Sequence, residues 1–356
     1  MICYKYRFFS SQKYSIFMLK DEVHLQNENE IEIIKLNSFQ PRFKWSKCDI
    51  SDIGQFELFD NRKSRIYKID SSQGMMLKEF LSGKVCFQGI NNHFKIAKII
   101  SNGNFGSMVR MRNLQNEELV TCKIYKQGRP ELEQEFRNEV LALQFLKHKN
   151  LPKIREYYIE ANHNYIIYDL FEGYPLDICI KNNILDNQQV YNIMKELLRV
   201  VKFIQMEGYS NQNIKLENIY YYSLMNQITL VDFGKSQFKN QSVIAGDSYF
   251  SKTTKDYSEL NTQTYRNAYQ EKDYFDCGLV FIQLITQKVL SHKDINYSEN
   301  NHIIMSLITE IHNQKISTFL MKLLSQNKTS DKSSFSQNIL TEIDDLNFEL
   351  TNYKNY

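Results

Sequence analysis

Apolar residues follow two different periods along this chain. In residues 1–93, short apolar runs at 14–21, 31–36 and 55–69 are separated by clusters of turn-forming residues. Runs of this length, rich in β-branched and aromatic residues, are typical of strands. Asp70 and two serines then precede a stretch with helical spacing. Its apolar positions, which we expect on one helical face, are Met76, Leu77, Phe80, Leu81 and Val85.

The pattern changes along the rest of the chain. Residues 94–168 alternate as strands do, around one helical stretch, whereas residues 185–205 carry an apolar residue every three or four positions. A strand-rich first part followed by a helical second part predicts an α+β protein. Residues 341–356 are polar, and we expect them to form a partly disordered tail.

Composition narrows the class of protein. The 356 residues carry a net charge of +3, with acids and bases interspersed, so we expect no nucleic-acid partner. The six cysteines show no CxxC spacing, which favours free thiols over metal ligands or disulfides. No apolar run approaches the ~18–20 residues that span a bilayer, and the first residues lack a signal-peptide core. We expect a cytoplasmic protein, with peripheral membrane contact as the alternative.

The most informative stretch is residues 209–234. It contains Lys215, Asn218 and the triplet Asp232-Phe233-Gly234, separated by a short alternating segment. This resembles the eukaryotic protein kinase core, in which His-Arg-Asp-x-Lys-x-x-Asn precedes two strands and Asp-Phe-Gly. The resemblance implies that Asn218 and Asp232 are the Mg²⁺ ligands. The His-Arg-Asp triplet is replaced by Asn211-Gln212-Asn213, so Asn213 stands where the family has its catalytic Asp.

Further motifs occur in the order of that family. Gly103 and Gly106 resemble two of the three glycines of its phosphate-covering loop, with Ser101 at the first. Lys123 follows twenty residues after Gly103, and Glu139 lies in the next helical stretch. In the family this Glu pairs with the Lys that holds the α- and β-phosphates.

The adenine end of the implied site departs from the family pattern. Residues 165–173 resemble the hinge, where Asp169 and Phe171 would contact ATP, with Tyr168 guarding the rear of the pocket. Bulkier residues than usual stand at three positions around the adenine: Met108, Thr121 and Tyr220. ATP and Mg²⁺ are therefore the implied cofactors, with weakened nucleotide binding. Asp273 to Gly278 resembles the family's Asp-x-Trp-x-x-Gly, but no Ala-Pro-Glu precedes it.

Residues 1–90 resemble a pleckstrin-homology domain. The hairpin, the Asp70-Ser71-Ser72 cap and the closing helix carry this resemblance, although the only Trp, Trp45, lies outside that helix. Lipid-binding members use basic residues near the first loop. Lys5 and Lys13 could serve, but Ser15 stands where an Arg is expected. We therefore favour a protein-interaction module over a lipid-binding one, with weak anionic-lipid contact at most.

Together these resemblances imply a bilobal protein kinase fold, with a β-rich N-lobe and a helical C-lobe, behind a helix-capped β-sandwich or barrel. The expected boundaries are 1–90, 94–172, 173–340 and 341–356. We interpret the chain as a pseudokinase that binds other signalling proteins. The alternatives are an active Ser/Thr-type kinase, favoured over a Tyr kinase by Lys215, and a membrane or protein adaptor with an inert kinase fold.

Overall fold

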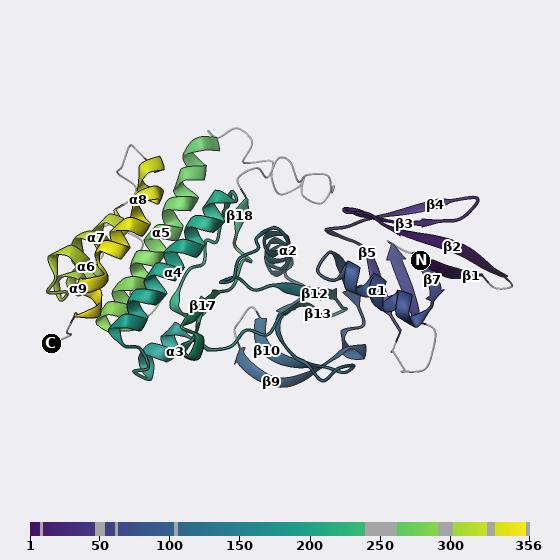
Figure 1. The fold of residues 1–356 in the computed structure, drawn as a ribbon, viewed down its shortest axis with the longest axis horizontal. Coiled ribbons are helices and arrows are strands. Elements are labelled where there is room, and N and C mark those ends of the chain that lie inside the picture. The colour runs from purple at the N-terminus through teal and green to yellow at the C-terminus, as the bar shows by residue number, and fades with distance from the viewer. Residues whose placement is uncertain are drawn as a thin grey trace. The chain divides into compact units, whose positions relative to one another are not determined.

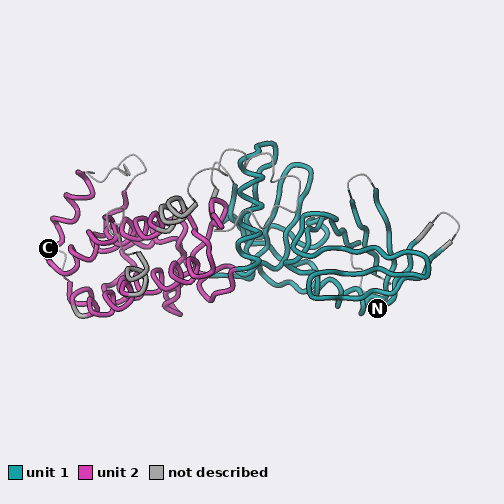
Figure 2. The backbone as a smooth tube through the Cα atoms, turned by 90° about the horizontal axis from the view of Figure 1, so that it is seen from above, with its two compact units in different colours: residues 1–145, 153–171 teal, residues 146–152, 172–356 magenta. Residues whose placement is uncertain are grey.

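The computed structural model describes residues 1–7, 10–46, 54–60, 63–102, 106–238, 262–290, 302–325 and 332–353. The chain divides into two compact units, which Figure 2 draws in teal and magenta. The first unit comprises residues 1–145 and 153–171, and the second comprises residues 146–152 and 172–356. Gly103, one of the expected phosphate-loop glycines, and most of the expected activation segment lie outside the described residues.

The first unit is built on a single 13-stranded sheet with the order β4-β3-β2-β1-β7-β6-β5-β8-β12-β13-β11-β10-β9. Its strands are β1 (Ile2–Arg7), β2 (Ser10–Met18), β3 (Glu22–Gln26), β4 (Ile31–Lys35), β5 (Ser38–Trp45), β6 (Gly54–Asp60), β7 (Lys63–Ile69), β8 (Val85–Gln88), β9 (Phe94–Asn102), β10 (Gly106–Asn113), β11 (Leu119–Lys126), β12 (Ile154–Ile159) and β13 (His163–Tyr168). Its helices are α1 (Ser71–Leu81) and α2 (Pro130–Phe145), both labelled in Figure 1, and the short 3₁₀ helix η1 (Ile90–Asn92).

The strand β8 joins the two predicted modules of this unit. It pairs in parallel with β5 on one side and with β12 on the other. One hydrophobic core runs through both modules, from Tyr14 and Trp45 to Val120 and Ile167. The N-terminal strands and the strands that carry Lys123 therefore share one sheet and one core. Residue patterns do not encode parallel pairing between distant segments, and this feature was not predicted.

The expected N-terminal strands and helix are present, with two corrections. Asp70 caps α1 by accepting hydrogen bonds from the backbone N–H groups of Ser72 and Gln73. The helix ends at Leu81, so Val85 belongs to β8 rather than to the helical face, because Gly83 turns the chain at a φ of +70°. Met76 is 57% exposed and does not belong to the buried face either.

The second unit is mainly helical. Its longer helices are α3 (Leu176–Lys181), α4 (Asn187–Met206), α5 (Thr262–Thr286), α6 (His302–Thr309), α7 (Gln314–Leu324), α8 (Lys332–Asp345) and α9 (Asn347–Thr351). The short elements are β14 (Tyr174–Pro175), β15 (Tyr209–Ser210), η2 (Leu216–Asn218), β16 (Ile219–Tyr222), η3 (Ser223–Met225), β17 (Gln227–Leu230) and β18 (Gln237–Phe238). The predicted long helix is α4, and a capping box between Asp186 and Gln189 fixes its start.

The end of the chain corrects one expectation. Residues 341–353 complete α8 and form α9, and Ile343, Leu346 and Leu350 are buried. These apolar residues pack in the helical unit, so residues 341–353 are not a disordered tail. Among the described residues, no helix is both long enough and apolar enough to cross a bilayer.

Candidate active site

A buried ion pair forms the centre of the site in the first unit. The ammonium of Lys123 on β11 lies 2.6 Å from Oε2 of Glu139 on α2, as expected from the sequence. Glu139 is 1% exposed, and its carboxylate also accepts hydrogen bonds from the hydroxyls of Tyr125 and, at 2.6 Å, Tyr168. A carboxylate this deeply buried needs a cation and further donors. Glu139 has one cation and two hydroxyl donors, which together hold its carboxylate in one position.

Tyr125 is a site residue that the sequence analysis missed. It lies two positions after Lys123 on β11, so both side chains point to the same face of the sheet. The Lys123 ammonium also lies 4.8 Å from the centroid of the Tyr125 ring. The period of two along the strand was the available signal. Nothing in the sequence indicated that the hydroxyl of Tyr168, from a neighbouring strand, would reach the same carboxylate.

Gly106 has a structural role of its own at the start of β10. A Cβ atom at this position would lie 2.2 Å from the backbone oxygen of Ile124 on β11, a distance that side chains do not tolerate. The close approach of β10 and β11 therefore requires glycine here, whether or not a phosphate binds.

The hinge segment holds the two other nucleotide residues expected in this unit. The carboxylate of Asp169 binds Arg155 and Lys153, and Arg155 in turn pairs with Glu118. The backbone N–H of Phe171 donates to the hydroxyl of Thr121 at 3.5 Å, a long hydrogen bond. Thr121, which we expected only to be bulkier than the usual residue beside the adenine, thus also contacts the backbone of the expected hinge.

In the second unit, the segment Asn211 to Asn213 is anchored by α5. Asp273 accepts hydrogen bonds from the backbone N–H groups of Asn211 and Gln212, both at 2.8 Å. Burial raises the pKa of Asp273 to about 7, against the lowering effect of these two hydrogen bonds. The loop therefore stays in place although its three side chains differ from the family pattern.

Asn213, Asn218 and Asp232 are brought together by the structure. The amide Nδ2 of Asn213 donates to Oδ2 of Asp232, and that of Asn218 donates to the same oxygen at 3.3 Å. A second bond from Asn218, at 2.9 Å, reaches the backbone oxygen of Asn213. Asn213 therefore acts as a hydrogen-bond donor toward the expected metal-binding carboxylate.

The remaining expected residues are buried or half-buried in their own units. Met108 and Thr121 are buried in the first unit, and Tyr220 is buried in the second. Lys215 is half-buried directly before η2, and its ammonium has no ion pair among the described residues.

Comparison with known proteins decides the family. Residues 94–348, well over half of the chain, match the family model of the protein kinase domain. The chain belongs to the protein kinase family. The β-rich first unit and the helical second unit fit the bilobal fold of this family.

Two relatives of this kinase domain illustrate the distance to characterised members. A G-type lectin S-receptor-like serine/threonine-protein kinase from Arabidopsis thaliana is 22% identical over 63% of this chain and 28% of its own length. A calcium/calmodulin-dependent protein kinase type 1 from Macrobrachium nipponense is 25% identical over 44% of this chain and 47% of its own length. The alignments thus span less than half of each relative.

The donor set of the kinase domain suits the cofactors of its family. Protein kinases bind ATP with Mg²⁺, which prefers hard oxygen ligands. The side chains of Asp232 and Asn218, which lie within hydrogen-bond distance of each other, would hold Mg²⁺ through their oxygens. Lys123, which pairs with Glu139, carries the positive charge that a phosphate group would require.

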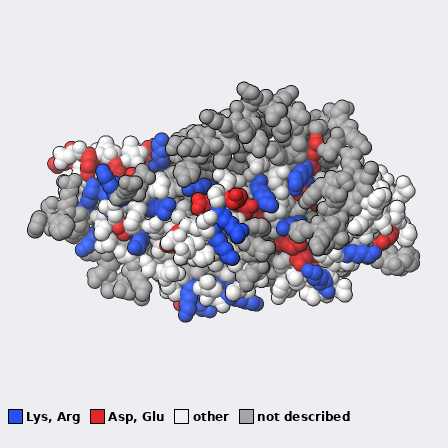
Figure 3. Space-filling view, turned by 180° about the vertical axis from the view of Figure 1, so that it is seen from behind, with Lys and Arg blue, Asp and Glu red and all other residues white. Residues whose placement is uncertain are grey.

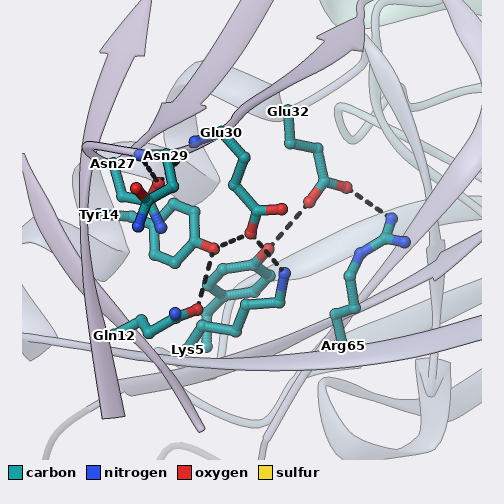
Figure 4. A network of polar contacts seen from close by, with 9 residues as sticks. Lys5, Gln12, Tyr14, Asn27, Asn29, Glu30, Glu32 and Arg65 are labelled. Carbon is teal, nitrogen blue, oxygen red and sulfur yellow. Dashed lines mark hydrogen bonds and ion pairs between the residues drawn. The ribbon is translucent and has the colours of Figure 1, made fainter. Parts of the chain in front are cut away.

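Two basic residues of the module that precedes the kinase domain form ion pairs with carboxylates of the same module (Figure 4). Lys5 pairs with Glu30 at 3.1 Å, and Arg65 pairs with Glu32. The hydroxyl of Tyr14 donates to Glu30, and Tyr67 donates to Glu32 at 2.9 Å. Lys5, one of the two lysines considered for lipid binding, is therefore already paired with a carboxylate of the same module.

Basic and acidic side chains of the described residues both occur on the face shown in Figure 3. A surface cavity of about 310 Å³ lies in the second unit, and its charged lining residues are Lys149, Lys195, Glu196 and Arg199. Glu196 binds Lys149 and Arg199 there. The cavity thus contains none of the ATP-site residues named above.

Proposed function

We propose that this chain is a catalytically impaired protein kinase that binds ATP and Mg²⁺ weakly and acts as a signalling scaffold or regulator. The observation that carries this proposal is the amide of Asn213, which donates a hydrogen bond to Asp232. The family has an Asp at this position to accept the proton of the substrate hydroxyl. An amide does not take up that proton, and loss of a general base typically costs about 10²–10⁴-fold in rate.

The residues that would bind nucleotide support retained binding. Lys123 is held by a buried carboxylate, so its charge stays in place for a phosphate group. Asn218 and Asp232 would hold Mg²⁺, which when bound neutralises phosphate charge. The bulk of Met108 and Thr121 and the contact between Thr121 and Phe171 support weak rather than tight binding of adenine.

A thermal-shift titration with ATP, with and without Mg²⁺, tests this proposal. A ligand that binds only the folded state stabilises it by about 2.7 kcal/mol at 100 times its Kd. We expect a small upward shift that needs millimolar ATP and is lost in Lys123→Ala. An unchanged melting temperature at every ATP concentration would leave the chain as a kinase fold without nucleotide.

The second candidate is an active but atypical Ser/Thr kinase. The intact pair of Lys123 and Glu139 favours it, because phosphoryl transfer depends mainly on positioning and charge neutralisation. The two relatives described above are also named as protein kinases, one of them as a serine/threonine kinase. Transfer of radiolabelled γ-phosphate to a mixture of protein substrates separates this candidate from the first.

The third candidate is an adaptor whose N-terminal pleckstrin-homology-like module binds proteins or, weakly, anionic lipids. The pairs between Lys5 and Glu30 and between Arg65 and Glu32 favour proteins over lipids, because these cations already have anionic partners. Tight, head-group-specific sedimentation with liposomes would reverse this preference.

A further inference from the structure

One aromatic residue of the N-terminal module packs against the helix that carries Glu139. Phe39, on β5, is buried, with its ring centroid 6.0 Å from that of Phe136 on α2 and 5.6 Å from that of Tyr157 on β12. The guanidinium of Arg137 lies 4.6 Å from the centroid of the same ring. Two successive residues of α2 thus contact a single side chain that lies outside the kinase domain.

Hydrogen bonds reinforce this contact on both sides. Gln144, near the end of α2, donates from Nε2 to the backbone oxygen of Gly83, at 2.9 Å, just before β8. The hydroxyl of the buried Tyr157 donates to the backbone oxygen of Ser38 at 3.2 Å. Both acceptors are backbone atoms outside residues 94–348, so they keep their positions only while the preceding module is folded onto α2.

The packed aromatic rings lead from Phe39 to the ion pair. Phe136 contacts the ring of Tyr125 at 5.7 Å, and the Tyr125 hydroxyl binds Glu139. Phe136 and Glu139 are three residues apart on α2, so a rotation or shift of the helix moves both side chains together. Close-packed interiors transmit such shifts because they leave no room for independent movement.

We infer that Phe39 is a positioning residue for the pair of Lys123 and Glu139. By filling the space between α2 and β12, it holds α2 where the carboxylate of Glu139 meets its cation and its two hydroxyl donors. The module before the kinase domain is thereby a built-in support for the phosphate-binding lysine. Its consequence for ATP rests on the proposed function, whereas the effect on the ion pair itself does not.

The test compares two matched variants of the full chain, Phe39→Leu and Phe56→Leu. Phe56 is buried as Phe39 is, but its ring contacts, with Phe43, Trp45 and Tyr67, lie within the module. Two quantities are measured without nucleotide: hydrogen exchange of the α2 amides, and acylation of Lys123 relative to the exposed Lys126 on the same strand. Both report the position of α2 and of the pair directly.

Phe39→Leu should speed hydrogen exchange of the α2 amides by up to about tenfold. This factor corresponds to the packing free energy that a substitution between large apolar side chains usually costs. It should also raise Lys123 labelling several-fold, whereas Phe56→Leu should change neither. Equal behaviour of the two variants would overturn the inference. If Phe39→Leu does not fold, Arg137→Gln, which removes the cation over the ring, takes its place with the same expectations in weaker form.

A thermal shift with ATP, measured separately on the same variants, distinguishes the two proposals. Faster α2 exchange with no ATP response in either variant or in the wild type would retain the positioning role and reject nucleotide binding. An ATP response that is the same in the wild type and in Phe39→Leu, with unchanged hydrogen exchange of α2, would retain nucleotide binding and reject the positioning role.

Discussion

The expected site residues fall into two halves, one in each unit, and each half surrounds one carboxylate with hydrogen-bond donors. Glu139 receives the ammonium of Lys123 and two tyrosine hydroxyls. The side-chain amides of Asn213 and Asn218 both donate hydrogen bonds to Asp232. The half in the first unit has the Lys and the Glu expected from the family, whereas position 213 in the other half is an amide where the family has an Asp.

This difference indicates separate constraints on the two halves. A buried carboxylate such as Glu139 cannot lose its cation without a large cost in stability, so folding alone can preserve that half. Asn213 is only half-buried, so the choice between an acid and an amide at this position affects the chemistry more than the packing. The presence of Lys123 and Glu139 is thus weak support for catalysis. The absence of an Asp at position 213 is the stronger argument, and it speaks against catalysis.

The largest effect is expected for Glu139→Ala. The substitution leaves the Lys123 ammonium and two buried hydroxyls without this acceptor, and breaking a buried pair typically costs about 3–5 kcal/mol. Urea unfolding followed by the fluorescence of Trp45, the only tryptophan and part of the same unit, measures the change. Glu131→Ala, at an exposed position of the same helix, is the control. A loss below about 1 kcal/mol would mean that folding does not preserve this half.

A smaller effect is expected for Asp273→Asn. One of the two acceptor oxygens becomes an N–H₂ group facing a backbone N–H, which costs about 1–3 kcal/mol for the unsatisfied buried group. Hydrogen exchange at the amides of Asn211 and Gln212 should accelerate, while Glu217→Gln, on the exposed side of the loop, should leave it unchanged. Unchanged exchange would mean that α5 does not anchor the altered loop.

The same aspartate predicts a pH dependence of stability. The pKa of Asp273 is raised to about 7 in the folded chain, from 3.8, by burial, with Lys272 opposing the shift. The folded state therefore binds more protons than the unfolded state between these values, and its stability should fall as pH rises from about 4 to about 7. Melting temperatures of the wild type and Asp273→Asn, measured from pH 4.5 to 7.5, check this. A wild-type slope that persists in the variant would assign the effect to Asp276, whose pKa is raised to about 6 by burial.

The smallest effect concerns the N-terminal module, where Lys5 and Arg65 form ion pairs with carboxylates. The double substitution Glu30→Gln and Glu32→Gln should remove the acidic partners of Lys5 and Arg65 and increase sedimentation with anionic vesicles. The expected gain in binding free energy is about 1 kcal/mol per cation near the surface. Trp45 fluorescence verifies that the variant is folded. Equal sedimentation of wild type and variant would show that these pairs do not limit lipid contact.

The resemblance to the kinase family named the candidate site residues, because its strand and helix motifs occur in a fixed order along the chain. It predicted the pair of Lys123 and Glu139 and the joint placement of Asn218 and Asp232, and the structure contains both contacts, whereas the nucleotide-binding roles of these residues stay predictions. The parallel strands β5 and β8 were missed, since pairing between distant segments leaves no periodic signal. Phe39 could not be singled out for the same reason: its contact with α2 exists only after β8 has joined the two modules.

The central claim is that phosphate binding is retained while proton acceptance at position 213 is lost. Phosphotransfer from ATP with Mg²⁺, measured for the wild type, Asn213→Asp and Lys123→Ala, tests it most directly. We expect wild-type turnover far below the family range of about 1–100 s⁻¹. Asn213→Asp alone should rescue less than tenfold, instead of the full ~10²–10⁴-fold of a general base, because Thr121 and Met108 still crowd the adenine. Wild-type turnover within the family range, abolished by Lys123→Ala, would contradict the account and establish an active kinase with an atypical catalytic loop.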